Sequence, residues 1–313
     1  SAFGASTPQL QVALEPALAR VFVYGEPELP SGVTRGSAPA DYLVTGVTRY
    51  TAPLRPLGLL RSGVKETAGD GSAAADRYPS SYLYEKWSTA APTNFGEYLA
   101  HYTQDMVLGK TSVVLPRATF LANEAAFDAA RKSQPYYIRE TTVPPMAYLV
   151  GGVPTVILRF PYIPAGLGLQ GDEGWFSFDG LYYAEHELRQ IIKTGKADNA
   201  RLQQAVQEAA LTEGSLSAPF ESHGISFHHR GYCYYTIPIR HFDDSEAPEK
   251  TAHGRYGLVR GNEYRIHLTR ILRPGSALPP DLSKDQRPLT EERDLRSVVH
   301  VRPVVTRSHE AHL

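Results

Sequence analysis

Short stretches of alternating apolar and polar residues recur along this chain, and they constrain its fold more than any other feature. Val156, Leu158 and Phe160 alternate along one segment, and strand-like patterns also run through residues 232–239 and 264–272. Successive side chains of a strand point to opposite faces, so a period of two is typical of β-structure. A chain with many such segments is expected to be an all-β protein built from packed sheets.

One region departs from this pattern. Residues 185–213 carry two apolar clusters at helical spacing, and Gly195 separates them. We therefore expect a short helical insertion made of two helices or one interrupted helix. Just before it, residues 175–183 hold the pair Asp179-Gly180, which suits the positive φ angles of a two-residue turn and predicts a β-hairpin.

The composition agrees with an all-β protein that has long connections. The chain contains 24 prolines, 26 glycines and 19 tyrosines, and the first two types end regular elements while tyrosine favours strands. Residues 51–80 and 274–294 are expected to be long irregular loops. Short helices are expected over residues 93–105 and 123–132.

Bulk properties exclude several classes of protein. The formal net charge is −1, and a nucleic-acid-binding protein would usually carry a basic excess. Cys233 is the only cysteine, so no intrachain disulfide can form, and its aromatic neighbours predict a buried thiol. The sequence contains no run of 18 apolar residues, the length that would predict a membrane-spanning helix. The chain begins at Ser1 rather than at methionine, which suggests a mature or trimmed form.

Four histidines are the first candidates for chemistry. His223, His228, His229 and His241 lie close together in sequence, but adjacent residues on a strand face opposite sides. We interpret them as exposed polar residues of a hairpin rather than as a metal site. Nucleophile and phosphate-binding motifs are absent, and Cys233 lies in the middle of a strand. The chain is therefore expected to be non-enzymatic and to hold no cofactor.

Several segments share a recognisable order. Three of them read YYIRETT at 136–142, GYCYYTIPIRH at 231–241 and YGLVRGNEYRI at 256–266. Further segments lie at 12–21, 154–159, 175–183 and 299–305. Taken together, they resemble the fimbrillin family of Bacteroidales, the subunits of type V pili, and especially its minor-fimbrium (Mfa-like) branch.

The resemblance implies transthyretin-like β-sandwich domains. On this basis residues 1–30 would be an N-terminal β segment, the remainder of a truncated or processed N-terminal domain. Residues 31–313 would form a C-terminal fimbrillin-like β-sandwich with long loops and the helical insertion near 185–213.

The same resemblance implies a structural subunit of a fimbria on the cell surface, attached to the outer membrane. Such subunits lose a first strand to an arginine-specific protease and then polymerise by donor-strand exchange. The expected partners are other fimbrial subunits, in a homo- or hetero-polymer, with host or bacterial surface ligands as further candidates and no nucleic acid.

The C-terminal tail is the candidate donor strand. Its apolar residues fall at alternate positions, which would lie on one face of a strand. They are Val299, Val301, Pro303, Val305, Ala311 and Leu313. Alternate side chains of an added strand fill pockets of the neighbouring subunit. The alternative is that residues 298–305 form an ordinary edge strand of the same chain.

Two other functions remain open at this point. The long loops would suit a tip adhesin or a surface module that binds carbohydrate or protein. A secreted enzyme is the second alternative, and a cleft that gathers strongly perturbed titratable groups would favour it.

Overall fold

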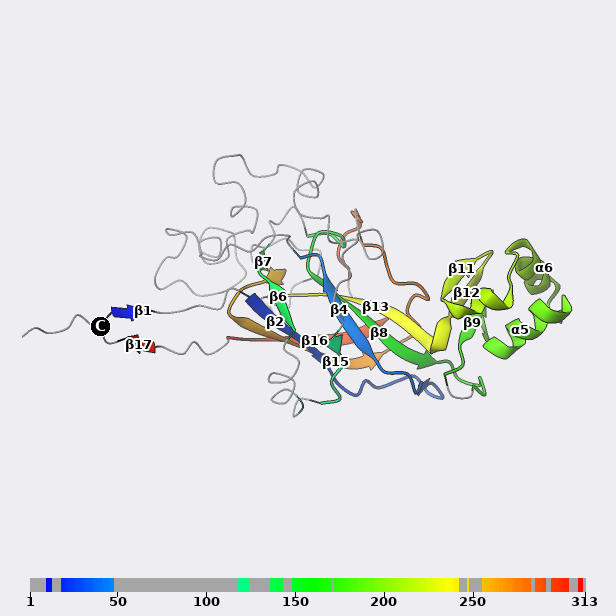
Figure 1. Cartoon of the computed structure of the whole chain (residues 1–313), viewed down its shortest axis with the longest axis horizontal. Coiled ribbons are helices and arrows are strands. Elements are labelled where there is room, and N and C mark those ends of the chain that lie inside the picture. The colour runs from blue at the N-terminus through cyan, green and yellow to red at the C-terminus, as the bar shows by residue number, and fades with distance from the viewer. Residues whose placement is uncertain are drawn as a thin grey trace, which may run out of the picture.

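The computed structural model describes residues 10–12, 18–47, 118–123, 126, 136–142, 148–169, 172–241, 247, 255–282, 285–290, 294–303 and 309–311. They form a body of two sheets with a smaller unit at one end (Figure 1). In these ranges no helix is long and apolar enough to cross a membrane. The expected loop at 51–80, the expected helix at 93–105 and most of the expected helix at 123–132 lie outside the described residues.

The first sheet of the body has five antiparallel strands. Its order is β13-β8-β4-β5, and β3 pairs with β8 beside β4. The strands are β3 (Thr34–Arg35), β4 (Asp41–Thr45), β5 (Ala118–Thr119), β8 (Thr155–Ile163) and β13 (Tyr232–Pro238). The long strands β8 and β13 correspond to segments that the sequence predicts as strands.

The second sheet has four strands in the order β16-β15-β2-β6. They are β2 (Leu18–Tyr24), β6 (Tyr137–Arg139), β15 (Asn262–Ile271) and β16 (Leu295–Pro303). β15 runs parallel to β2, and the other two pairs are antiparallel. Since β2 lies inside this sheet, residues on both sides of position 30 build one sandwich. The expected division of the chain at that position stays a prediction.

The two sheets pack face to face and share one apolar core. Leu158, Phe160 and Ile237 from the first sheet belong to the same buried cluster as Val23 and Ile266 from the second, and all five are fully buried. Aligned packing of this kind defines a β-sandwich. The expected all-β sandwich fold is therefore confirmed.

The outer face of the first sheet is also covered. Leu43, Ile157, Tyr234 and Leu282 form a second buried cluster on that side, and Leu282 comes from the loop that follows β15. Because β8 is buried on both faces, its sequence shows a nearly continuous apolar run in which Arg159 is one of the few interruptions.

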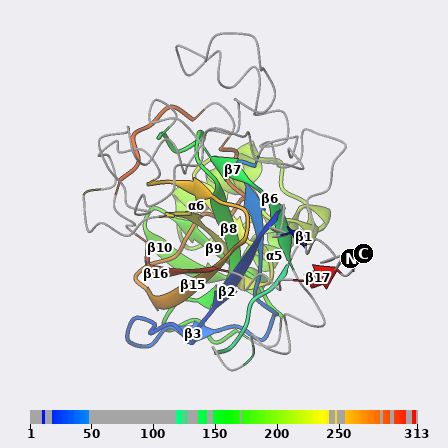
Figure 2. The same ribbon diagram turned by 90° about the vertical axis from the view of Figure 1, so that its left-hand side faces the viewer.

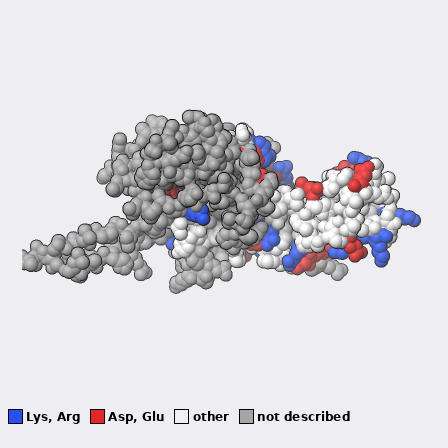
Figure 3. All heavy atoms as spheres, turned by 45° about the horizontal axis from the view of Figure 1, so that its top comes forward, with Lys and Arg blue, Asp and Glu red and all other residues white. Residues whose placement is uncertain are grey.

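A separate unit, residues 172–231, projects from the end of the body and is called the distal module below (Figure 1). Its elements are β9 (Trp175–Phe178), β10 (Leu181–Ala184), α5 (Glu185–Thr194), α6 (Ala200–Glu208), the 3-10 turn η3 (Glu213–Ser217), β11 (Phe220–Ser222), β12 (Ile225–His228) and the 3-10 turn η4 (His229–Gly231). Its four strands form one sheet in the order β10-β9-β12-β11. Acidic and basic side chains are interspersed on the face that Figure 3 shows.

The distal module has its own apolar core, which packs the two helices on its sheet. Phe176, Phe227, Leu188, Leu202 and Val206 are members of this cluster. The module is inserted between β8 and β13, two strands that pair with each other in the body. Sequence analysis predicts the helical insertion correctly, and the structure adds the small sheet beneath it.

Local sequence signals explain the turns of the module. Asp179 and Gly180 have φ angles of 48° and 79°, as the tight turn between β9 and β10 requires. Gly195 ends α5 in the left-handed conformation, with φ 70°, and its amide donates to the carbonyl oxygen of Ile191. The Asn199 side chain caps the start of α6. The predicted hairpin and the predicted break in the helical region are both confirmed.

Two small ladders complete the described structure. β7 (Thr141–Thr142) pairs with β14 (Gly257–Leu258), and β1 (Leu10–Val12) pairs with β17 (His309–Ala311). The β1–β17 ladder lies away from the sandwich, at the end of the molecule opposite the distal module (Figures 1 and 2). Residues from the beginning and the end of the sequence therefore pair with each other.

Candidate functional site

Two of the sequence segments that resemble fimbrillins meet in a buried ion pair. Arg260 Nε donates to Glu140 Oε2 at 2.7 Å, and the Arg260 amide donates to Glu140 Oε1 at 3.2 Å. Both side chains are 2% exposed. Glu140 follows β6 and Arg260 precedes β15. The ion pair therefore holds together the segment that leaves β6 and the segment that enters β15. Sequence reasoning missed this pairing because 120 positions separate the two residues.

Two further residues of these segments share a hydrogen bond. The Tyr264 hydroxyl lies 2.7 Å from His241 Nδ1 and accepts a 2.7 Å hydrogen bond from the amide of Val259. Tyr264 is fully buried and His241 is 7% exposed. The polar residues that the segments contribute thus satisfy one another inside the protein, which is a structural role.

The structure places the candidate donor residues in two different strands. Val299 and Val301 lie in β16, which pairs antiparallel with β15, and both pack against the sandwich core. Pro303 is the last residue of β16 and lies opposite Asn262. Ala311 lies in β17, opposite Leu10 of β1.

Val305 and Leu313 lie outside the described residues. β16 is thus an edge strand of its own sandwich, and β17 is a separate short strand outside it. A donor role for the residues beyond β16 stays a prediction.

Residues 226–310 match the family model described as "Major fimbrial subunit protein type IV, Fimbrillin, C-terminal". The matched region contains β13 to β16, together with Arg260, His241 and Tyr264. Residues 226–310 are therefore similar to the C-terminal region of fimbrillins. The resemblance to fimbrillins is therefore confirmed, whereas this match does not distinguish the minor-fimbrium branch from the others.

Two solved structures are similar to the chain. The first is a fimbrilin from Porphyromonas gingivalis W83, with 12% identity and a TM-score of 0.36, and the similarity covers 93% of this chain but 59% of that one. The second is a protein from Parabacteroides distasonis ATCC 8503 named for cell adhesion, with 13% identity, a TM-score of 0.35 and coverages of 96% and 67%. This chain thus spans less than two thirds of the Porphyromonas fimbrilin. No curated protein matches it by sequence.

The family that residues 226–310 match is one of fimbrial structural subunits, not of enzymes. The pair formed by Cys233 and His228 is unsuited to catalysis. Cys233 Sγ lies 3.3 Å from His228 Nδ1, but the thiol is fully buried and burial raises its pKa. An activated thiolate needs the opposite shift.

The histidines do not converge on a metal. Over the described ranges, no group of three or more potential metal ligands gathers. The expectation of exposed turn residues is wrong for two of the four. His228 is 3% exposed and stacks on Trp175 with ring centroids 3.7 Å apart, and His241 is the buried partner of Tyr264. A neutral imidazole can replace an apolar ring in a core, and the sequence pattern did not reveal this.

His228 should make the stability of the folded protein depend on pH. Burial lowers the pKa of His228 to about 4, from the ordinary value of about 6.5 that the unfolded chain retains. The folded protein therefore resists protonation between these values while the unfolded chain accepts a proton. Its contribution to stability is complete above pH 6.5 and is lost as the pH falls towards 4, by up to roughly 3 kcal/mol.

Urea unfolding at pH 7 and at pH 5 measures this effect. We expect His228→Phe, which keeps an aromatic ring on Trp175, to lose less stability than the unsubstituted chain when the pH falls from 7 to 5. The exposed His223, whose φ of 48° suits asparagine, offers the control His223→Asn, which should leave the pH dependence unchanged. Equal pH dependence in all three proteins would contradict the assignment to His228.

Proposed function

We propose that the chain is a structural subunit of a bacterial cell-surface fimbria that joins its neighbours by donor-strand exchange. The fimbrillin match supports the fimbrial part of this proposal. The β1–β17 ladder supports strand exchange, because it joins the tail to another strand through three residue pairs outside the sandwich. Proteolytic maturation, attachment to the outer membrane and support of adhesion belong to the same proposal.

The energetics of the β1–β17 ladder favour exchange. An isolated two-stranded ladder is only marginally stable in water, whereas a strand added to a larger sheet gains hydrogen bonds and apolar contacts. Releasing β17 from β1 would therefore cost little. Within the described residues, β16 and β6 end the second sheet, and an unpaired edge is a template for another strand.

Deletion of residues 306–313 tests the proposal. With the tail present, mixing the chain with its cognate subunits should give a ladder of high-mass polymers on an unheated denaturing gel. The shortened chain should lose this ladder, because the donor segment is missing. A ladder that the deletion leaves unchanged would refute the tail as donor.

A matched pair of substitutions makes the test specific to one face of the tail. Ala311→Asp combined with Leu313→Asp places charges at the parity that would fill pockets, whereas Glu310→Asp combined with His312→Asp changes the other parity. We expect the first pair to abolish the ladder and the second to preserve it. Equal effects of the two pairs would contradict insertion of an alternating strand.

A further inference from the structure

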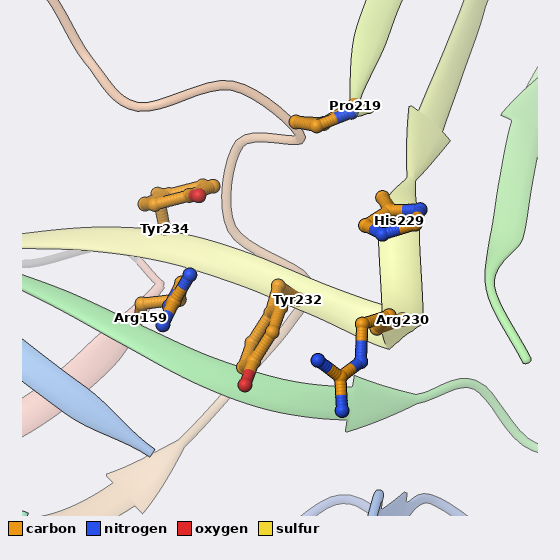
Figure 4. Close-up of a pocket in the computed structure, with 6 residues that line it drawn as sticks. All are labelled: Arg159, Pro219, His229, Arg230, Tyr232 and Tyr234. Carbon is orange, nitrogen blue, oxygen red and sulfur yellow. The ribbon is translucent and has the colours of Figure 1, made fainter. Parts of the chain in front are cut away.

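A pocket lies where the distal module joins the sandwich (Figure 4). Its volume is about 220 Å³, and its lining residues are Arg159, Pro219, His229, Arg230, Tyr232 and Tyr234. Pro219, His229 and Arg230 come from the distal module, and the other three from β8 and β13. Junctions between two packed units are common places for ligand sites.

The sandwich side of the pocket is set by the pairing of β8 with β13. Tyr234 lies directly opposite Arg159 in the ladder, and Tyr232 lies two residues before Tyr234 on the same face. The Arg159 guanidinium lies 4.3 Å from the centre of the Tyr232 ring. Arg159 Nε donates to Asp41 Oδ1 at 3.0 Å, and a second nitrogen donates to the other carboxylate oxygen. The guanidinium is thus held in place before any ligand arrives.

The distal module contributes a second guanidinium, on a strained residue. Arg230 has a φ of 56°, a left-handed conformation that side chains rarely adopt, so the surrounding structure must hold it there. One of its terminal nitrogens donates to Asp172, whose carboxylate also accepts a 2.9 Å hydrogen bond from the Ser37 hydroxyl. Its Nε is buried and makes no hydrogen bond with any residue that the structure describes. A buried donor without an acceptor is rare and points to a missing partner.

Among the described residues, the lining is rich in donors and has no carboxylate. Asp41 occupies two nitrogens of Arg159 and Asp172 occupies one of Arg230, so each guanidinium retains donors. The Leu216 carbonyl oxygen lies 3.0 Å from His229 Nδ1 and fixes that ring at the rim. Such a lining suits a ligand that supplies acceptor oxygens and negative charge.

We propose that this pocket binds a carboxylate-bearing sugar, in which the acid group meets the Arg230 and Arg159 donors. Tyrosine rings beside the guanidiniums offer apolar surface and a hydroxyl to the sugar ring. The volume is below the roughly 300–1,000 Å³ of sites for drug-sized ligands, so it fits a single sugar ring. This inference does not depend on strand exchange, since none of the candidate donor residues that the structure describes lines the pocket.

Titration of the full chain with glucuronic acid tests the proposal, and glucose is the matched probe that lacks the carboxylate. Calorimetry or ligand-observed NMR should detect weak, saturable binding of glucuronic acid and none of glucose at the same concentration. Arg230→Gln should weaken glucuronic acid binding about tenfold or more, the usual effect of losing a charge-assisted hydrogen bond.

Arg201→Gln is the control variant. Arg201 lies in the same distal module and pairs with Asp179 at 2.9 Å, but its side chain is 77% exposed and away from the lining. It should leave binding unchanged. If Arg230→Gln does not fold, Tyr234→Phe takes its place and should weaken binding about threefold, as expected for a neutral hydrogen bond.

Three results would overturn the proposal. The first is no binding of glucuronic acid, and the second is equal binding of glucose. The third is an equal response of the lining variant and Arg201→Gln. Competition by N-acetylglutamate amide with the same affinity would instead assign the pocket to acidic peptides and overturn the sugar assignment.

Discussion

Trp175→Ala is expected to lower the free energy of unfolding by about 3–5 kcal/mol, the usual cost of removing a large buried aromatic side chain. Trp175 is fully buried and belongs to the sandwich core, while its neighbour Phe176 belongs to the core of the distal module. Its indole stacks on His228, meets Tyr182 edge-on at 5.4 Å and donates a 2.7 Å hydrogen bond to the Tyr162 carbonyl oxygen. One side chain therefore connects the module to the body.

Because Trp175 lies between the module and the body, its replacement should change hydrogen exchange locally as well as lower the overall stability. Hydrogen exchange should rise more in residues 172–231 than in β15 when Trp175 is replaced, because the module loses its main contact with the sandwich. Leu181→Ala is a suitable control, since Leu181 lies on the neighbouring strand and is 58% exposed. Its effect on stability should stay within about 0.5 kcal/mol. A uniform rise in exchange along the chain would contradict the connecting role of Trp175.

Glu140→Gln is expected to cost about 3–5 kcal/mol, because it removes the carboxylate charge that pairs with the buried Arg260 guanidinium. Glu28→Gln is the matched control. Glu28 also pairs with an arginine, Arg270, but the two side chains are 66% and 51% exposed. Surface pairs of this kind contribute about 0–1 kcal/mol. Urea unfolding of both variants at pH 7 compares the two sites directly.

A double-mutant cycle separates the ion pair from the other contacts of these residues. Combining Glu140→Gln with Arg260→Met removes both charges of the pair, whereas each single change removes only one. The combined loss of stability should therefore be smaller than the sum of the two single losses. Additive losses would show that the two side chains contribute independently, and would refute the importance of their pairing.

The sequence predicts those parts of the fold that depend on neighbours in the chain. Strand-like apolar patterns mark β8, β13 and β15, the Asp179-Gly180 pair marks a hairpin, and Gly195 marks the break between two helices. Each of these signals acts within a few residues.

What the sequence does not predict depends on pairs of distant residues. The parallel pairing of β2 with β15, the Glu140–Arg260 ion pair and the stacking of His228 on Trp175 each require the sheets to be assembled first. The pocket is even harder to predict from the sequence. Arg230 lines it with a left-handed backbone conformation, which no local preference of arginine would indicate. The candidate donor residues share only their alternate positions in the tail, and this pattern does not identify the strand with which they would pair.

The way in which the distal module is inserted should allow its sequence to vary during evolution. The chain leaves the body at the end of β8 and returns at the start of β13, and these strands pair with each other, so the exit and the return are adjacent. The free energy of closing such an excursion grows only slowly with its length. Insertions, deletions and new surface chemistry in residues 172–231 would therefore leave the register of the sandwich untouched. Variation among related chains should concentrate there, at the end far from the paired terminal strands (Figure 1).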